Sequence, residues 1–322
     1  ELEVSQMSVR LLKQMESINK IAVLYGGSSS EREISLQSGE GVHRAILELG
    51  FESDLIDFSS IENLQDLKKF DFIFIALHGF EGEGGKLQED LDHFNILYSG
   101  SNSEACKNTW NKKFAKQILE KNRIKTPISL AVMFGKQIVK HALKGSPYDR
   151  FIPFKYLFLK PIEDGSSVDI FKITDAKSLE EAYRMCANPD REFIFEEFID
   201  GREFTVTIIG DECLPPIEII TKNEFYDYDA KYISDDTHLK EAKLSDDEMK
   251  EIKKIAIDAF NALSCNAWGR VDLIQCDRTR KFYVIEINTV PGMTTHSCVP
   301  KSGGILGLSY NEVVKKIIDA SV

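Results

Sequence analysis

Cysteine is scarce in this sequence of 322 residues, and no long apolar run occurs in it. The six cysteines form no CxxC pair and no regular spacing, which argues against a disulfide framework and is typical of reduced, mostly buried thiols. No apolar run approaches the roughly 20 residues that a membrane-spanning helix requires. The first residues, ELEVSQMSVRLLKQMESINK, are charged throughout and lack the apolar core of a signal peptide. We therefore expect a cytoplasmic protein.

Positive charge is also in short supply. Lysine and arginine total 40 against 52 aspartates and glutamates, so the net charge is −12. Nucleic acids and anionic membranes favour a positive surface, and we expect neither as a partner. A local pocket of lysines and arginines is still compatible with an anionic ligand. The length allows two or three domains at roughly 100–200 residues each.

The chain begins with alternating strand and helix patterns. Apolar runs at 21–27, 51–58 and 70–79 predict strands, and the apolar spacing over 30–50 predicts a helix. This alternation predicts a parallel α/β sheet, which binds ligands at the carboxyl ends of its strands. Glu31 follows the first strand at that edge, where it either reaches a ligand or supports the start of the helix.

From about residue 104 onward, helices and hairpins replace this alternation. We expect helices at 105–122, 178–188 and 247–265, hairpins at 158–173 and 268–288, and a β-rich segment with a glycine turn at 192–209. These shifts of pattern predict domain boundaries near residues 104 and 194.

The hairpin at 268–288 carries the strongest chemical signal. Glu286 and Asn288 are two residues apart on one strand, so both side chains point to the same face of the sheet. If the strands pair around DRTRK, Asp272 faces them from the neighbouring strand, with Arg270 on the same face. Two carboxylates and an amide oxygen suit Mg²⁺, and the arginine offers a cation for a developing negative charge. The alternative is a solvated polar face, which four polar groups within apolar strands make less favourable.

A second candidate site lies in LKPIEDGSSVD, where Lys160 ends an apolar strand. The turn that follows includes Ser166 and Ser167, whose backbone N–H groups and hydroxyls are suited to cradle a phosphate. An ordinary β-turn explains these residues equally well, and the spacing of a Walker A loop is absent. Lys112, on the helix predicted at 105–122, is either another phosphate ligand or a surface lysine.

Three other segments carry weaker signals. Glu196 and Glu197, with Ile199 shortly after, are typical of a segment where a nucleotide base stacks and bonds to the backbone. His78 begins a loop of glycines, HGFEGEGG, which is either a mobile loop over a ligand or a surface turn. The tyrosines at 225–232 predict a loop that closes over a site, or else a partly buried aromatic loop.

The order and spacing of these segments resemble those of the D-alanine–D-alanine ligases of the ATP-grasp superfamily, from Ile21 to Val322. The segments that carry the resemblance are YGGSSSEREISLQSG, LHGFEGEGGKLQ, NKKFAK followed by TP, KPIEDGSSV, EEFIDGREFTV, FYDYDAKY, GRVDLI and EINTVPGMTTHS. The resemblance implies an α/β ATP-grasp fold, in which a parallel α/β domain precedes two α+β domains that clasp ATP. It assigns residues 1–104 to the N-terminal substrate-side domain, 105–194 to the central ATP-grasp subdomain, and 195–322 to the C-terminal subdomain with the metal and second-substrate sites.

The resemblance also implies ATP-dependent ligation of two D-alanines through an acyl phosphate, for peptidoglycan precursor synthesis. It implies ATP as a substrate, two Mg²⁺ ions with Mn²⁺ as a substitute, and a homodimer. The nearest alternative is a relative that makes D-alanyl-D-lactate or another D-dipeptide. Tyr232 favours the peptide, because ester-forming relatives tend to carry Phe there. A nucleotide-binding protein without catalysis is a second alternative, and the complete polar set on the hairpin argues against it.

The resemblance assigns roles to the residues that match the motifs of the family. The catalytic group comprises Glu31, Ser166, Tyr232, Arg270 and the backbone N–H of Gly292. The ATP-binding group comprises Lys112, Lys160, Ser167, Glu196, Glu197, Ile199, Glu203 and Lys231. The substrate group comprises His78, Ser297 and Cys298, and the Mg²⁺ ligands are Asp272, Glu286 and Asn288.

Four departures from the pattern of the family stand out. Asp169 occupies a position where glycine is usual, and an acid near ATP phosphates is unfavourable unless it points away. Asn111 replaces an acid ahead of Lys112, and FEGEGG lacks the usual acid after Glu83. Cys298 replaces leucine and is a smaller group with a thiol that has the potential to react, beside the second-substrate pocket. None of them removes a group that this chemistry requires.

Overall fold

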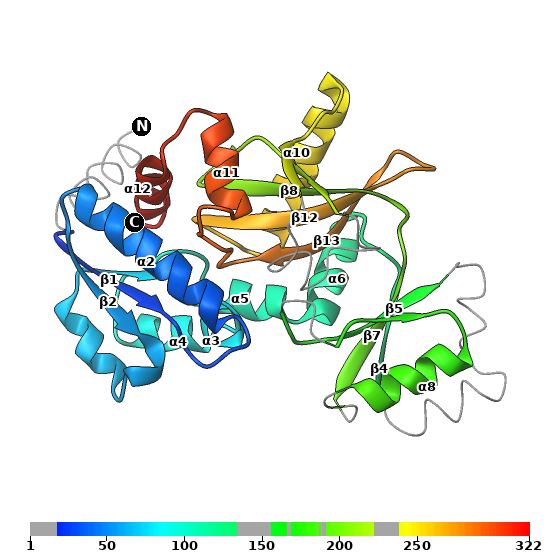
Figure 1. The fold of residues 1–322 in the computed structure, drawn as a ribbon, viewed down its shortest axis with the longest axis horizontal. Coiled ribbons are helices and arrows are strands. Elements are labelled where there is room, and N and C mark those ends of the chain that lie inside the picture. The colour runs from blue at the N-terminus through cyan, green and yellow to red at the C-terminus, as the bar shows by residue number, and fades with distance from the viewer. Residues whose placement is uncertain (1–17, 134–155, 166–168, 187, 189–190, 222–237) are drawn as a thin grey trace.

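The computed structural model of the chain describes residues 18–133, 156–165, 169–186, 188, 191–221 and 238–322 (Figure 1). These residues form a three-stranded, a four-stranded and a six-stranded sheet. Among the helices of the described residues, none combines the length and the apolar composition that crossing a bilayer would need.

The N-terminal sheet is parallel, as the sequence predicts. Its order is β2-β1-β3, built from β1 (Lys20–Tyr25), β2 (Glu52–Asp57) and β3 (Phe72–Ile75). The connection between β1 and β2 is the helix α2 (Arg32–Glu48), which packs on both strands. The strands β1 and β3 are almost entirely buried, because apolar residues cover both of their faces.

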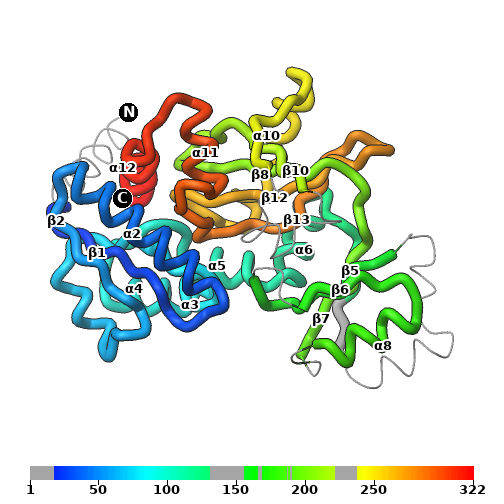
Figure 2. The backbone as a smooth tube through the Cα atoms, viewed as in Figure 1, coloured from blue at the N-terminus to red at the C-terminus, as the bar shows by residue number. Residues whose placement is uncertain are grey.

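The last helix of the chain completes the core of this N-terminal domain. Helix α12 (Tyr310–Ala320) lies against α2, so the red end of the ribbon is beside the blue helix in Figures 1 and 2. Val314 and Ile317 share one buried cluster with Val42 and Ile46 of α2. A division of the chain into consecutive segments therefore does not describe this core.

Four short helices follow the last strand of the N-terminal sheet and precede the central sheet. Helices α3 (Phe80–Glu83) and α4 (Lys86–His93) follow β3, and α5 (Ser103–Trp110) and α6 (Lys112–Lys121) come next. The prediction of a single helix at 105–122 is therefore wrong, because two helices, α5 and α6, occupy this segment.

Asn111 interrupts the predicted helix. Its backbone is extended, with ψ at 101°, and its side chain accepts a hydrogen bond from the backbone N–H of Phe114 at 3.1 Å. Asparagine is a preferred residue at this capping position, because its oxygen satisfies an N–H group that the helix leaves free. A local capping signal therefore overrides the continuous apolar stripe.

The central sheet is antiparallel, with the strand order β4-β7-β5-β6. Its strands are β4 (Ser129–Met133), β5 (Leu157–Pro161), β6 (Phe171–Ile173) and β7 (Glu192–Glu197). The hairpin predicted at 158–173 is confirmed by the pairing of β5 with β6. Helix α8 (Ala176–Met185) packs on this sheet and buries Leu179 against it, where a helix was predicted at 178–188.

The boundary predicted near residue 194 falls inside β7, so it needs correction. The chain leaves the central sheet only after Glu197 and enters the next sheet at Gly201. The β-rich pattern at 192–209 does not reveal this change, because two consecutive strands can pair with different neighbours. The three-domain division otherwise remains a prediction.

The C-terminal sheet has the strand order β11-β10-β8-β12-β13, with β9 paired to β8. Its strands are β8 (Gly201–Ile209), β9 (Glu212–Cys213), β10 (Ile217–Ile220), β11 (His238–Glu241), β12 (Trp268–Cys276) and β13 (Phe282–Asn288). Helix α10 (Asp246–Ala262) covers one face, and α11 (Cys298–Ile305) contacts β8 and β11. Ala105 of α5 and Leu119 of α6 belong to the same buried cluster as β8 and β12.

Candidate functional site

The predicted site residues come from all three sheets and their connections, and charged groups from these parts interact with one another. Glu286 on β13 acts electrostatically on Lys112 of α6 and on Lys160 of β5. It also acts on Glu83 of α3, which is within the field of Glu31 and of Arg270 on β12. The fold thus brings one carboxylate of the C-terminal sheet close to groups from both other sheets.

Strands β12 and β13 place four predicted residues on one face. Arg270 pairs with Asn288 across the strands, and Asp272 pairs with Glu286, so the predicted hairpin register is confirmed. Asp272 is 6% exposed, and its carboxylate accepts two hydrogen bonds of 2.8 Å from the guanidinium of Arg270. The same carboxylate accepts a hydrogen bond of 2.6 Å from the hydroxyl of Thr205 and one of 3.0 Å from the side-chain amide of Asn288.

These oxygen atoms fit a Mg²⁺ site by their chemistry. Asp272, Glu286 and Asn288 offer carboxylate and carboxamide oxygens, which are hard ligands. Within the described residues, no group of three or more His, Cys, Asp or Glu side chains is arranged to hold a metal. The carboxamide of Asn288 is therefore needed to complete a protein set of three. An ion bound at Asp272 would replace hydrogen bonds that its oxygens now accept.

Glu196 lies between two lysines in a buried ionic group. Its carboxylate is 2.5 Å from Nζ of Lys160 and 2.7 Å from Nζ of Lys116. Burial would raise the pKa of Glu196, but the two lysines lower it to about 2. Lys116 also donates to the hydroxyl of Thr126 at 2.8 Å and to the carbonyl of Pro127 at 2.9 Å. A buried charge of this kind needs such partners, because an unpaired charge in the interior is strongly unfavourable.

Lys116 is a residue that the sequence interpretation missed. It follows Lys112 by four residues on α6, so both side chains lie on one side of the helix. That spacing was the available signal.

Lys112 is anchored to the strand end that precedes the glycine-containing turn. Its Nζ donates to the carbonyl of Asp164 at 2.6 Å, and its backbone N–H donates to the carbonyl of Ile162 at 3.0 Å. The preceding residue, Asn111, donates from its side chain to Glu163 at 2.7 Å. The start of α6 and the end of β5 are therefore one connected unit.

The connection between β7 and β8 is fixed by Glu197 and by aromatic rings. The carboxylate of Glu197 accepts a 2.9 Å hydrogen bond from the backbone N–H of Ile128. Phe198 stacks on Tyr156, with 4.4 Å between ring centroids, and Ile199 is buried. Glu203, farther along, acts electrostatically on Lys160. The predicted base-binding segment thus has an apolar and aromatic lining close to the ionic group of Glu196.

Glu31 lies where the N-terminal loop meets the glycine-containing turn. A Cβ placed on Gly165 would be 3.0 Å from Oε2 of Glu31, and one on Gly79 would be 3.3 Å from it. The backbone N–H of Glu31 donates to the hydroxyl of Ser29, which donates to the carbonyl of His78 at 2.9 Å. Glycines are needed at 79 and 165 because a side chain there would crowd the carboxylate.

His78 is buried and connects β3 to the turn at Pro291 and Gly292. Burial lowers its pKa, so the ring is neutral. Its Nδ1 is 2.9 Å from the carbonyl of Val290, which only accepts, so Nδ1 carries the proton and donates. Its Nε2 then accepts from the hydroxyl of Ser38 at 2.9 Å, and Ser38 accepts from the backbone N–H of Met293.

Glu83 is a second residue that the sequence interpretation missed. Burial and the neighbouring Glu31 raise its pKa to about 8, while the backbone N–H of Gly79 donates to its carboxylate at 3.1 Å. Its position in a loop of glycines after a strand was the signal available. The group is protonated near neutral pH, which limits the negative charge around Glu31.

The turn after β13 brings Gly292 next to Ser297. A Cβ on Gly292 would be 2.9 Å from the hydroxyl oxygen of Ser297, so glycine allows the close approach. Ser297 also accepts from the backbone N–H of Thr294 at 3.0 Å. Cys298 is 3% exposed, and burial raises its pKa to about 11, so it is a protonated thiol. A buried, protonated thiol is a weaker nucleophile than a thiolate.

Four predicted site residues lie outside the described part of the chain. They are Ser166, Ser167, Lys231 and Tyr232. Their roles remain those that the resemblance implies.

Known proteins are similar to this chain over most of its length. A family model described as "D-ala D-ala ligase C-terminus" matches residues 152–319. The D-alanine–D-alanine ligase of Marinobacter nauticus is 38% identical over 307 residues, covering 94% of this chain and 91% of the relative. That of Marinomonas sp. is also 38% identical over 307 residues, covering 92% and 94%.

Solved structures show the same likeness. The D-alanine–D-alanine ligase of Bacillus anthracis complexed with ATP has a TM-score of 0.79 and 29% identity, covering 94% of this chain and 97% of that one. The VanG D-Ala:D-Ser ligase of Enterococcus faecalis has a TM-score of 0.81 and 27% identity, covering 95% and 100%. The expected ATP-grasp fold is thereby confirmed. This chain belongs to the D-alanine–D-alanine ligase family.

Proposed function

We propose that this enzyme joins two D-alanines at the expense of ATP, for peptidoglycan precursor synthesis. The observation that carries the proposal is the meeting of two ionic groups at one place. The Arg270–Asp272 pair lies with Glu286 and Asn288 on one face of strands β12 and β13. Glu286 acts electrostatically on the two lysines of the other group, Lys112 and Lys160. The ligase relatives at 38% identity and the ATP-complexed neighbour support the same reaction.

The reaction begins with activation of a poor acyl donor. A carboxylate oxygen of the first D-alanine attacks the γ-phosphorus of ATP, ADP leaves, and an acyl phosphate forms. Lys112 and Lys160 would balance charge on the phosphates, since Glu286 acts electrostatically on both of them. Two Mg²⁺ ions held by Asp272, Glu286 and Asn288 would neutralise further phosphoryl charge.

The second half of the reaction forms the peptide bond. The amine of the second D-alanine attacks the acyl carbon, a tetrahedral oxyanion forms, and phosphate departs with the bonding electrons. Arg270 and the backbone N–H of Gly292 would stabilise the oxyanion, an effect of roughly 3–4 kcal/mol per well-placed donor. Arg270 binds Asp272 through Nε and Nη2 at 2.8 Å, which fixes its guanidinium on this face of the sheet.

The substrate contacts extend this proposal to both ends of the site. Glu31 would bind the ammonium of the first D-alanine, with Ser166 and Tyr232 completing a hydrogen-bonded group. His78 lies beside this group, and Ser297 and Cys298 would contact the second D-alanine. The remaining ATP contacts are proposed for Ser167, Lys231, the Glu196–Ile199 segment and Glu203.

A different second substrate is the rival that an observation favours. The VanG neighbour is named a D-Ala:D-Ser ligase and covers 95% of this chain at a TM-score of 0.81. Phosphate release should therefore be measured with ATP and D-Ala, L-Ala, D-Ser or D-lactate in parallel. We expect release with D-Ala alone and none with L-Ala. Faster turnover of D-Ala with D-Ser or D-lactate than with a second D-Ala would replace the proposed product.

The metal assignment has its own test. We expect E286Q to lower kcat by at least about a hundredfold, because a ligand to the charge-neutralising ions is lost. Mn²⁺ binding followed by electron paramagnetic resonance should weaken in parallel, which gives a readout independent of turnover. E251Q is the matched control, since Glu251 lies on α10 and pairs with the solvent-facing Lys281 at 3.6 Å. Unchanged Mn²⁺ binding in E286Q would exclude Glu286 as a ligand.

We also propose a homodimer located in the cytoplasm. The net charge of −12 and the composition of the described helices support a protein that does not depend on a membrane. Light scattering after size-exclusion chromatography should give about twice the 36.5 kDa mass of the chain. A monomer at micromolar concentration would contradict the dimer without affecting the reaction.

A further inference from the structure

Asp169 closes the glycine-containing segment in an unusual backbone conformation. Its φ is 53°, in the left-handed region that residues other than glycine rarely adopt. The family pattern has glycine here, and an acid near ATP phosphates is unfavourable unless its charge is directed elsewhere. The structure directs it elsewhere, because the carboxylate of Asp169 is only 9% exposed and lies against Arg191.

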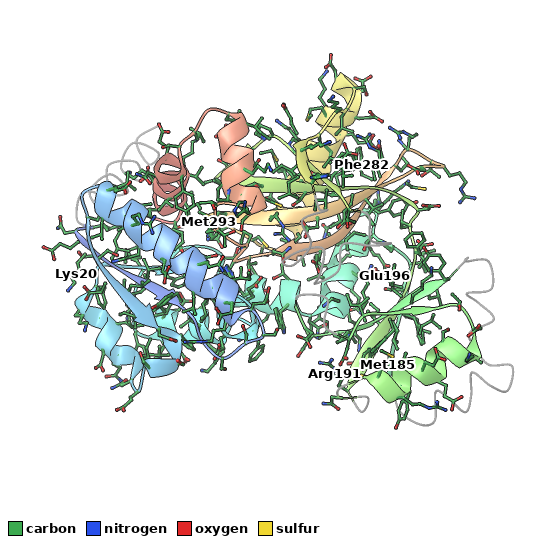
Figure 3. The ribbon with its side chains drawn as sticks, in the orientation of Figure 1. Lys20, Met185, Arg191, Glu196, Phe282 and Met293 are labelled. Atoms are coloured by element: carbon green, nitrogen blue, oxygen red, sulfur yellow. The ribbon has the colours of Figure 1, made fainter. Side chains whose placement is uncertain are left out.

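Arg191 binds acids on both sides of this segment. Its Nη2 is 2.6 Å from Oδ2 of Asp169, and its Nη1 is 2.8 Å from Oδ2 of Asp164. Cys186 adds a thiol donor to the same oxygen of Asp169 at 3.4 Å. Arg191 directly precedes β7, whereas Glu196 lies near the other end of that strand (Figure 3). We call the group of Arg191, Asp164 and Asp169 the arginine clasp.

The clasp reaches the nucleotide side of the site through Asp164. The other oxygen of its carboxylate accepts from the backbone N–H of Gly165 at 3.0 Å. Its carbonyl accepts from Nζ of Lys112 at 2.6 Å. Movement of Asp164 would therefore move both the first residue of the glycine-containing turn and the lysine proposed to hold a phosphate.

We propose that Arg191 is a positioning residue for the nucleotide site. It neutralises the acid that replaces glycine at 169, and it holds Asp164 so that Lys112 and Gly165 keep their places. The planar fork of arginine binds two carboxylates at once, which the single ammonium of lysine does less well. The effect on ATP rests on the proposed function, whereas the effect on the local structure does not.

Loss of Arg191 removes the guanidinium that Asp164 and Asp169 share, and the carbonyl of Asp164 contacts the lysine proposed to hold a phosphate. Both charges then repel the nucleotide, and Asp164 loses a fixed partner. Replacing Asp169 by glycine removes one of these charges and suits the left-handed backbone. The two residues should therefore be coupled, so that the second change partly repairs the damage of the first.

Steady-state kinetics of the unmodified protein and five variants test this coupling. We expect R191M to raise KM for ATP about tenfold with a smaller change in kcat, and D169G to change KM by less than about threefold. The double variant R191M/D169G should recover to within about threefold of the unmodified protein, and R191K should fall between R191M and the unmodified protein. The matched control is R184M, since Arg184 pairs with Glu180 on the exposed face of α8.

Tryptophan fluorescence tests the local structure without any ligand. The chain has two tryptophans, of which Trp268 is fully buried, so acrylamide quenching reports Trp110. Trp110 lies against Gly165, where a Cβ would be 3.6 Å from its ring. We expect R191M to increase quenching of Trp110, and R184M to leave it unchanged.

The outcomes separate this inference from the proposed function. An unmodified protein that releases no phosphate from ATP and D-alanine overturns the function, while the quenching result still decides the clasp. Unchanged quenching and unchanged KM in R191M overturn the clasp, as does a double variant no better than R191M. If R191M does not fold, R191K and D169G take its place in both measurements. R191K with the kinetics and quenching of the unmodified protein would contradict the need for the planar guanidinium of Arg191.

Discussion

At the scale of single residues, the charged groups of the site are held by other charged groups rather than by solvent. Glu196 and Lys116 have side chains only 4% and 5% exposed, and Lys160 completes the group. An isolated charge at such a position would cost several kcal/mol, so all three residues depend on one another. The carboxylate of Glu196 is thereby kept ionised and fixed in place.

Glu83 shows the opposite behaviour, because its neighbours oppose its ionisation. Burial and Glu31 raise its pKa to about 8, well above the value for the unfolded chain. Because the pKa of Glu83 is higher in the folded protein, its contribution to the free energy of unfolding is complete at pH values below its pKa in the unfolded chain. This contribution is lost as the pH rises through its pKa in the folded protein. The window is therefore from about pH 4.5, the ordinary value for glutamate, to about pH 8.

The variant E83Q should remove this pH dependence. Between pH 5 and 8, the unfolding free energy of the unmodified protein should fall relative to that of E83Q, by up to about 1.4 kcal/mol per pH unit. Urea denaturation at both pH values measures the difference. E62Q, at an exposed position, serves as the control. Parallel profiles for E83Q and the unmodified protein would show that Glu83 titrates normally.

At the scale of elements, the break between α5 and α6 matters for the site. Asn111 caps α6 through Phe114 and also binds Glu163, next to the glycine-containing turn. The residue that follows it is Lys112, so the cap determines where this lysine begins its helix. An uninterrupted helix would carry Lys112 away from the carbonyl of Asp164.

Removal of this cap should be costly. We expect N111A to lower the unfolding free energy by about 1–3 kcal/mol, from a lost cap and a lost hydrogen bond to a carboxylate. N102A is the matched control, because Asn102 caps α5 through Ala105 and should cost only about 1 kcal/mol. Urea denaturation compares them. Equal losses in the two variants would mean that the Asn111–Glu163 contact contributes nothing.

At the scale of the whole molecule, two helices far apart in the sequence, α2 and α12, share one core. Helix α12 fills the N-terminal core against α2, and Ile317 there is fully buried. The N-terminal domain is consequently incomplete until the last residues of the chain are in place. The stability of the N-terminal sheet thus depends on a helix that follows the C-terminal sheet in the chain.

Truncation of one side chain in α12 should reveal this dependence. We expect I317A to lower the unfolding free energy by about 2–5 kcal/mol, the range for a large apolar residue in a core. L306A should change it by less than about 0.5 kcal/mol, since Leu306 is 48% exposed. Thermal and urea unfolding measure both. A loss in I317A no greater than in L306A would show that α12 is not part of the core.

Many of the secondary-structure elements, and the part of the site on the β12–β13 hairpin, could be predicted from the sequence because their signals are local. The strands of the N-terminal sheet and the hairpin of β12 and β13 follow from apolar runs and from turns. Residues that alternate along paired strands share a face, so Arg270 and Asp272 were expected to meet Glu286 and Asn288. The order of the motifs indicated the family for the same reason, since it is a property of the chain itself.

Only the tertiary structure decided which distant residues meet. Arg191 joins Asp164 to Asp169, Lys116 joins Glu196, and α12 joins α2, although nothing in the local sequence of either partner indicates the other. Such contacts depend on how whole elements pack, and the apolar periodicity of an element shows which face is buried but not what covers it. By itself the sequence determined the main elements, the register of the β12–β13 hairpin and the family. Packing decided which charges neutralise one another, because a buried charge is stable only beside a partner that the fold supplies.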